Sequence, residues 1–182
     1  MLKLATRSPP QVHPEEWMTP LPPASRFILH GDSLARTAAS PVWGAAFSEE
    51  PCRAVLRGSR ATLWLGPGEY LLLDLTAEPA GATIAALESA LGNIPHALVD
   101  ISHRQFALAI SGPHAQVMLN GACPLDLDIA EFPIGMCTRT VLAKADITLW
   151  RTHADGFHLE VWRSFGGYVT GLLREIAGEF YG

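Results

Sequence analysis

Apolar residues alternate with polar ones, or form short runs, in segments bounded by glycine, proline and aspartate, which is typical of β-strands. Two strands are predicted in the middle of the chain, through residues 98–101 and 106–110. Two other segments, residues 83–92 and 165–180, carry apolar residues at helical spacing and predict amphipathic helices. Ser164 is the predicted N-cap of the second helix. The pattern therefore mixes strands and helices.

The chain also repeats its own pattern. FILHGDSLARTAASPVWG matches LAISGPHAQVMLNGACPLD, and CRAVLRGSRATLWLGPGEYLLL matches CTRTVLAKADITLWRTHADGFHLEV. In each copy a strand ends at a glycine, Gly31 or Gly112, and a helix of about three turns then reaches a proline, Pro41 or Pro124. Two or three strands follow, joined by glycine-containing turns that suit hairpins, and a helix closes the copy.

This order of elements predicts an α+β fold of two pseudo-repeated ferredoxin-like halves, with antiparallel strands and helices on one face. The expected organisation is a single domain over residues 25–182, built from repeats of about 25–95 and 96–182. We expect neither half to fold alone. The strand through residues 98–101 is expected to be buried, near the junction of the halves.

Residues 1–24 contain six prolines and predict an N-terminal arm outside the helices and sheets. Trp17 and Met18 give this arm an apolar anchor. Packing against its own domain, packing against a partner and a frayed terminus remain three possible states of the arm.

The composition and charge of the chain exclude some classes of function. The 182 residues are 48% hydrophobic and 17% charged, against about 25% charged in a typical soluble domain, which favours a covered surface. The net charge is −5 and no lysine or arginine cluster occurs, so nucleic acid is not an expected partner. There is no apolar run of about 20 residues and no signal-peptide pattern, so we expect a cytoplasmic protein without a membrane span. The cysteines are expected to be reduced thiols: Cys52, Cys123 and Cys137.

One polar cluster follows the central strand. Asp100, Ser102, His103 and Arg104 lie close together in the sequence. Because side chains alternate along a strand, Ser102 and His103 point apart and are not a nucleophile and its base. Asp100 and Ser102 share a face, and the choice between fixing the local turn and facing a ligand remains open.

Other sequence features give little support for a cofactor or a metal. Asp126 and Asp128 in CPLDLD resemble the start of a calcium loop, but the glycine and the distal glutamate of such a loop are missing, so a solvated turn is predicted. The histidines show no metal-binding spacing. No Gly-x-Gly-x-x-Gly or Gly-Lys-Ser/Thr motif occurs, so we expect any flavin, NAD or nucleotide to be held by another chain.

Several motifs taken together resemble one family: VDISHRQ, SGPHA, NGACPLDLD, FPIGMCTRT and RSFGGY are similar to the gamma subunit family of heterotetrameric sarcosine oxidase. The resemblance spans about residues 26–168. This family is in turn similar to the folate-binding domain of the glycine-cleavage aminomethyltransferase, which shares the Asp-x-Ser strand, here Asp100 and Ser102, and the Gly-Pro helix start.

The resemblance implies a non-catalytic subunit with an assembly role in a complex that oxidatively demethylates sarcosine to glycine. It implies alpha, beta and delta subunits as partners, which would carry the FAD, FMN, NAD and tetrahydrofolate, with no cofactor in this chain. The implied interface or vestigial pocket comprises Asp100, Ser102, His103, Arg104, Asp126, Asp128 and Arg139.

An independent tetrahydrofolate-binding protein for aminomethyl transfer is the alternative, with a pocket near Asp100, Ser102, Arg104 and Arg139. Aminomethyltransferases carry a glycine-rich loop with paired aspartates after the returning strand, whereas this chain runs directly from Leu142 to Ile147 and keeps Asp146 alone. The resemblance therefore does not favour autonomous transfer. A homo-oligomeric scaffold is a third hypothesis.

Overall fold

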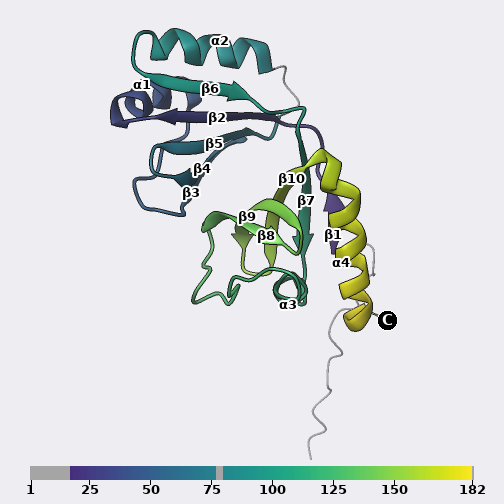
Figure 1. The fold of residues 1–182 in the computed structure, drawn as a ribbon. Helices are drawn as coiled ribbons and strands as arrows, with labels where there is room; N and C mark the ends of the chain where they lie inside the picture. The colour runs from purple at the N-terminus through teal and green to yellow at the C-terminus, as the bar shows by residue number, and fades with distance from the viewer. Residues whose placement is uncertain (1–16, 77–79, 182) are drawn as a thin grey trace, which may run out of the picture.

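The computed structural model describes residues 17–76 and 80–181, which form two antiparallel sheets with helices on their outer faces (Figure 1). The first sheet has the strand order β3-β4-β5-β2-β6. Helices α1 and α2 cover one of its faces. Its elements are β2 (Ser25–Gly31), α1 (Ser33–Trp43), β3 (Ala54–Arg57), β4 (Arg60–Gly66), β5 (Glu69–Asp74), α2 (Ala80–Leu91) and β6 (His96–Asp100).

The second sheet has the strand order β1-β7-β10-β9-β8 and is covered by α3 and α4. Strands β9 and β10 form a hairpin in this sheet, as β4 and β5 do in the first. Its elements are β1 (Met18–Pro20), β7 (Gln105–Ser111), α3 (Ala115–Asn120), β8 (Cys137–Leu142), β9 (Ala145–His153), β10 (Gly156–Trp162), the 3₁₀ turn η1 (Arg163–Phe165) and α4 (Gly166–Tyr181).

The two halves exchange their first strands. Strand β1 precedes the first sheet in the chain but pairs with β7 of the second, and β6 precedes the second sheet but pairs with β2 of the first. The run β2-α1-β4-β5-α2-β6 then has the order of a ferredoxin-like half, with β3 added at the edge, and the second half follows the same plan. The predicted α+β fold of two ferredoxin-like halves is confirmed.

Strand β1 corrects part of the prediction for the N-terminal segment. Met18–Pro20 was expected to lie outside the sheets but pairs with Leu108 to Ile110 of β7. A proline is tolerated there because Pro20 ends an edge strand. Trp17 is 4% exposed and stacks on Tyr181 with ring centroids 6.2 Å apart, so this anchor packs on its own domain. Residues 1–16 of the predicted arm lie outside the described residues.

Three further expectations about element boundaries and burial are wrong. Pro41 lies inside α1, which continues to Trp43 and ends at Gly44 with φ of +86°. Ser164 lies within η1 and caps no helix. The strand expected to be buried, β6, lies at a sheet edge, and its Val99 is 50% exposed.

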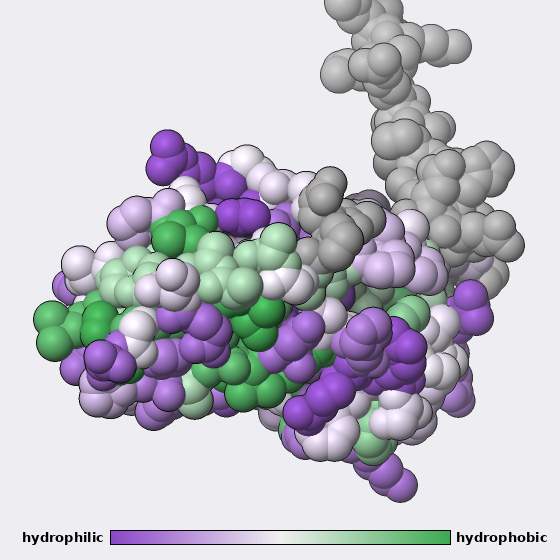
Figure 2. All heavy atoms as spheres, turned by 90° about the horizontal axis from the view of Figure 1, so that it is seen from above, coloured by the Kyte–Doolittle hydropathy of each residue, from purple (hydrophilic) through white to green (hydrophobic). Residues whose placement is uncertain are grey.

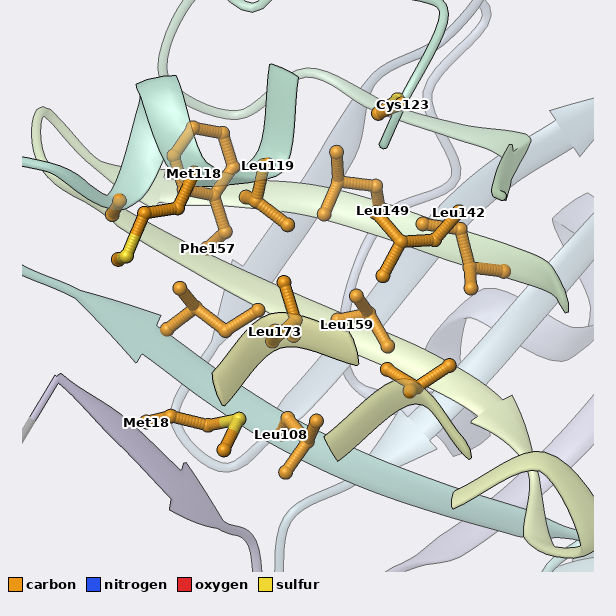
Figure 3. Close-up of a cluster of buried hydrophobic side chains, with 14 of the residues drawn as sticks. Met18, Leu108, Met118, Leu119, Cys123, Leu142, Leu149, Phe157, Leu159 and Leu173 are labelled. Atoms are coloured by element: carbon orange, nitrogen blue, oxygen red, sulfur yellow. The ribbon is translucent and has the colours of Figure 1, made fainter. Parts of the chain in front are cut away.

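Apolar side chains form a layer on each side of each sheet. One layer lies between the second sheet and its helices, where Met18, Leu108, Phe157, Leu159 and Leu173 converge (Figure 3). A second lies between the first sheet and α1 and α2. The third joins the two sheets directly, with Cys137 and Trp150 packed against the first sheet. Residues between the two sheets are therefore held by strands on both sides.

The exposed side of α4 differs from the predicted apolar stripe. Val169, Leu173 and Ala177 are the residues that α4 buries against the sheet. Phe165 and Tyr168 are apolar residues of the segment 165–180 and were expected to belong to that stripe, but both are exposed. None of the helices within residues 17–76 and 80–181 combines the length and the apolar character needed to cross a bilayer.

Candidate functional site

A cavity of about 480 Å³ lies between the two sheets. The first sheet contributes side chains from β2, β4, β5 and β6, and the second contributes side chains from β7, β8, β9 and β10. Apolar residues such as Ile28, Leu71 and Ile147 make up much of the wall. The charged side chains that line it are Glu69, Arg104, Arg139, Asp146 and Glu160.

Glu160 is the buried charged group of this cavity. Strand β10 directs Phe157, Leu159 and Val161 into the helix-side core, so the alternate residues face the first sheet. Arg26 of β2 donates from Nε to Oε2 of Glu160 at 2.7 Å, and Nε2 of His158 lies 2.7 Å from Oε1.

The exposed fractions in this cluster are 1% for the Glu160 side chain, 3% for Arg26 and 6% for His158. Both carboxylate oxygens therefore have partners, as a buried carboxylate requires. Because Arg26 belongs to the first sheet and Glu160 to the second, the pair also joins the sheets inside the protein.

Arg139 and Glu69 form a second ion pair at the rim of the cavity. The two terminal nitrogens of Arg139 each donate to one carboxylate oxygen of Glu69, at 2.9 and 2.5 Å. The hydrogen bonds from Arg139 hold the pKa of Glu69 below its ordinary value, against the opposing effect of burial. The pair is solvent-accessible, with exposed fractions of 48% for Arg139 and 26% for Glu69.

Arg104 and Trp162 form the remaining part of the rim. The guanidinium carbon of Arg104 lies 4.8 Å from the centre of the Trp162 ring, which is a cation–π contact. Both residues line the cavity, and Trp162 is 49% exposed. Of the residues predicted for an interface or pocket, Arg104 and Arg139 are therefore the two that the structure brings together.

Asp100 and Ser102 fix the turn between β6 and β7. Oδ1 of Asp100 accepts hydrogen bonds from the backbone N and the Oγ of Ser102, at 2.8 and 2.6 Å. Oγ of Ser102 accepts a bond from the backbone N of Arg26 at 2.9 Å. These contacts favour the turn-fixing role over the ligand-facing one. His103 lies exposed on the same turn.

Asp126 and Asp128 lie in the loop between α3 and β8, away from the residues that line the cavity. Oδ1 of Asp126 accepts from the backbone N of Asp128, and Oδ1 of Asp128 accepts from the backbone N of Ala130, both at 2.9 Å. Such bonds are typical of Asx turns. In the part of the chain that the structure describes, no three His, Cys, Asp or Glu side chains are grouped to hold a metal ion.

The cysteines are free thiols in the structure. Cys137 lies between the sheets and its Sγ is 3.5 Å from the backbone O of Trp64. Burial raises the pKa of its thiol to about 12, so the nucleophilic thiolate is scarce at neutral pH.

Sequence reasoning did not identify the buried Glu160 cluster or Trp162. A signal was present in GFHLEVW, where His158, Glu160 and Trp162 alternate with three large apolar residues. Alternation of this kind predicts that one face of the strand is polar, but it does not show that the face is buried. The partners Arg26 and Glu69 are distant in the sequence and belong to the other sheet.

Chemically, the cavity combines apolar walls with charges that are mostly paired within the chain. Glu160 is bound by Arg26 and His158, and Glu69 by Arg139. Arg104 and Asp146 add one charge of each sign at the wall. The arrangement stabilises the contact between the sheets and leaves a cavity that a small molecule could enter.

Comparison with solved structures finds proteins that share this fold. One structural match is a chain of the heterotetrameric sarcosine oxidase from Corynebacterium sp. U-96 in complex with pyrrole 2-carboxylate, with a TM-score of 0.83 and 27% identity over 91% of this chain and 85% of that one. The glycine cleavage system aminomethyltransferase T from Bartonella henselae shares the fold, with a TM-score of 0.64 and 17% identity over 86% of this chain and 44% of that one.

Comparison of sequences assigns the chain to a family. The sarcosine oxidase subunit gamma of Corynebacterium sp. strain P-1 is 36% identical over 121 residues, or 66% of this chain and 58% of the relative. The chain thus aligns with less than two thirds of the length of this curated relative. Residues 30–179 match the sequence model of the sarcosine oxidase, gamma subunit family. The chain therefore belongs to the sarcosine oxidase gamma subunit family.

Proposed function

We propose that this chain is the gamma subunit of a heterotetrameric sarcosine oxidase, a complex that oxidatively demethylates sarcosine to glycine, and that it serves assembly rather than catalysis. In this proposal the alpha, beta and delta subunits are its partners in the cytoplasm. FAD, FMN, NAD and tetrahydrofolate are bound by those subunits. Family membership and the structural likeness to a chain of such a complex support the proposal.

In this proposal the exposed side of α2 is the surface that contacts other subunits. Helix α2 contains one charged residue, Glu88, and its exposed positions are otherwise small and uncharged: Gly81, Ala82, Ala85, Ala86 and Ser89. A band of hydrophobic residues runs along this helix on the surface of the molecule (Figure 2). A helix that faces water usually has charged residues on its outer side.

Helix α4, which occupies the corresponding place in the second half, provides an internal comparison. Its exposed side carries Arg174, Glu175 and Glu179. The two helices cover equivalent sheets, but only α4 has the charged side expected of a solvated helix. This contrast supports a protein contact over α2, because the interiors of interfaces are poor in charge.

The cavity supports a structural role as well. Its buried carboxylate is bound by Arg26 and His158, and Glu69 at the rim is bound by Arg139. Each ion pair with an arginine joins one sheet to the other. Side chains held in this way contribute to the contact between the sheets, which suits a subunit whose work is to present a fixed surface.

Co-expression with the candidate alpha, beta and delta chains tests the proposal. We expect this chain to co-elute with them in size-exclusion chromatography, and the purified chain alone to be colourless. If the other chains co-elute with full sarcosine oxidase activity while this chain elutes alone, the assembly role is wrong. Flavin absorbance in the purified chain would contradict the assignment of the flavins to the partners.

An independent tetrahydrofolate-binding protein for aminomethyl transfer is the second candidate function. The observation that favours it is the cavity of about 480 Å³ with Arg104 and Asp146 at its wall. Calorimetry of the purified chain with tetrahydrofolate distinguishes the two, because micromolar binding would support this candidate. Light scattering of the same sample tests a homo-oligomeric scaffold.

A further inference from the structure

Three large aromatic side chains are exposed where β10 runs into α4. Trp162 is 49% exposed, Phe165 is 37% exposed and Tyr168 is 41% exposed. The rings of Phe165 and Tyr168 meet edge to face, with centroids 6.3 Å apart. Aromatic residues are enriched in protein interfaces because they bury a large area at low cost in side-chain entropy. Three of them within seven residues mark this corner as a surface for contact.

Basic groups surround these aromatic rings. The guanidinium of Arg104 lies on Trp162, and the backbone N of Arg163 donates to the backbone O of Arg104 at 2.7 Å. This bond places the β6–β7 turn beside the start of α4, as Figure 1 shows. His103 is exposed on the same turn. We call Arg104, Trp162, Arg163, Phe165 and Tyr168 the aromatic–basic corner.

The start of α4 adds to the positive potential of the corner. Its first turn contains no acidic residue, so the positive end of the helix dipole is not offset by a side chain of that turn. The nearest carboxylates in the sequence are Asp100, whose Oδ1 accepts from Ser102, and Glu160, which is paired with Arg26 and His158. In a chain whose net charge is −5, this concentration of cationic groups is a local exception.

The corner continues into the cavity between the sheets. Arg104 and Trp162 belong to both, and Val99, which is 50% exposed, lies on the cavity wall beside them. The surface therefore combines a rim that favours carboxylates with a recess that can receive an apolar side chain. Interfaces commonly place an apolar anchor in a pocket and polar contacts around it.

We propose that the aromatic–basic corner docks an acidic segment of another subunit of the complex, with carboxylates against Arg104 and Arg163 and an apolar side chain in the recess beside Trp162. The inference rests on the proposed function, because it requires partner subunits. Charge complementarity selects this occupant over a second copy of the chain. A twofold contact centred on this corner would bring the arginines of the two copies close together.

The test uses the complex assembled from this chain and the alpha, beta and delta subunits. The double variant Arg104→Glu/Arg163→Glu reverses the charge of the corner, and Arg104→Lys/Arg163→Lys keeps it. Arg174→Glu on the exposed side of α4 is the matched control for charge reversal. Thermal unfolding of each isolated chain checks that the variants fold.

We expect the double glutamate variant to bind the partner subunits at least about tenfold more weakly at low salt, since rim charges govern association most strongly there. The lysine variant and Arg174→Glu should bind within about twofold of the unchanged chain. Binding of the unchanged chain should weaken between about 50 and 200 mM salt, and binding of the glutamate variant should change less.

Any other result of this experiment contradicts one part of the proposal. If the unchanged chain joins the complex and the double glutamate variant joins equally well, the corner is not the docking site, while the proposed function stands. If the unchanged chain does not join, both proposals fail. If the pure chain forms a dimer that the double glutamate variant abolishes, the occupant is a second copy and the acidic segment is wrong.

Discussion

Arg139 of β8 and Glu69 of β5 clamp the two sheets together at the rim of the cavity. Both terminal nitrogens of the guanidinium donate to the carboxylate, which gives the two-point geometry that arginine forms with carboxylates. The residues are 70 positions apart in the sequence. They join the sheets at the surface, whereas Arg26 and Glu160 join them in the interior.

Replacement of Arg139 should reveal the pH dependence of this clamp. The pKa of Glu69 is lowered by Arg139, so the stabilisation is present above the ordinary glutamate pKa of about 4.3 and is lost as the pH falls through the lowered pKa. Because the pair is solvent-accessible, Arg139→Gln should cost about 0.5–1 kcal/mol at neutral pH. Urea unfolding at pH 7 and at a pH below the lowered pKa of Glu69 measures this destabilisation and its disappearance.

Arg53→Gln is the matched control for this measurement. Arg53 pairs with Glu50, which is 66% exposed, and the two lie three residues apart rather than on different sheets. The decrease in the free energy of unfolding on Arg53→Gln should be close to zero at both pH values. Equal effects of the two substitutions, or a loss at Arg139 that persists at low pH, would contradict the clamp.

Removal of the buried carboxylate should cost much more. Glu160→Ala leaves Arg26, which is 3% exposed, as an unpaired charge between the sheets. Breaking a buried pair by removing one partner costs about 3–5 kcal/mol. The free energy of unfolding in urea is the measurement.

The double variant Arg26→Met/Glu160→Met distinguishes the unpaired charge from simple loss of packing. It removes both charges and keeps apolar volume, so it should be less destabilising than Glu160→Ala. A double variant as unstable as the single one would show that Glu160 acts through something other than its pairing with Arg26.

Local sequence patterns predicted the fold class because strands, helices and hairpin turns depend on neighbouring residues. The repeat added the expectation of two similar halves. The exchange of β1 and β6 between the sheets was not predicted, because strand pairing between distant segments has no signal in local periodicity. The same limit explains why Val99 was expected to be buried, since an edge strand can carry the same apolar residues as a central one.

The candidate site could be predicted only in part, because some of its residues are brought together by contacts between distant segments. Arg104 stands out as a charged residue just before a strand and Arg139 as one within a strand, and both line the cavity. Asp100 and Ser102 also stand out, but they bind each other in a turn. Glu160 could be recognised as a buried charge only through Arg26, and the two are 134 residues apart.

His96 should titrate above its ordinary pKa. Its Nδ1 lies 2.7 Å from the backbone O of Ile94, and its Nε2 lies 3.0 Å from Oε2 of Glu88, so both ring nitrogens have acceptors when the ring is charged. The bond to Ile94 is the larger cause of the raised pKa, and Glu88 adds to it. The stabilisation is therefore complete below the unfolded pKa of about 6.5 and is lost as the pH rises through the raised value.

NMR titration of the His96 ring measures this pKa directly. Glu88→Gln should lower it part of the way toward about 6.5, because the contact with Ile94 remains. Glu179→Gln, an exposed charge on α4, is the control and should leave the pKa unchanged. A His96 pKa that does not respond to Glu88→Gln would show that the carboxylate does not act on the ring.

Two adjacent glycines at the start of α4 should respond in opposite directions to the same added methyl group. A Cβ on Gly166 would lie 2.9 Å from Cδ1 and 3.1 Å from Cγ of Phe106, so the ring on β7 would have to move. A Cβ on Gly167 would meet no atom within 4 Å. Both residues are helical, so their intrinsic gain from alanine is similar.

We therefore expect Gly166→Ala to lose about 1–3 kcal/mol through overpacking, and Gly167→Ala to gain up to about 1 kcal/mol. Gly166 is buried beside Phe106, whereas Gly167 is exposed, so the difference reports the packing of α4 on the second sheet. Urea unfolding of both variants measures the two changes in the free energy of unfolding. Stabilisation by both would mean that the Phe106 ring moves freely and that the start of α4 is not held closely against β7.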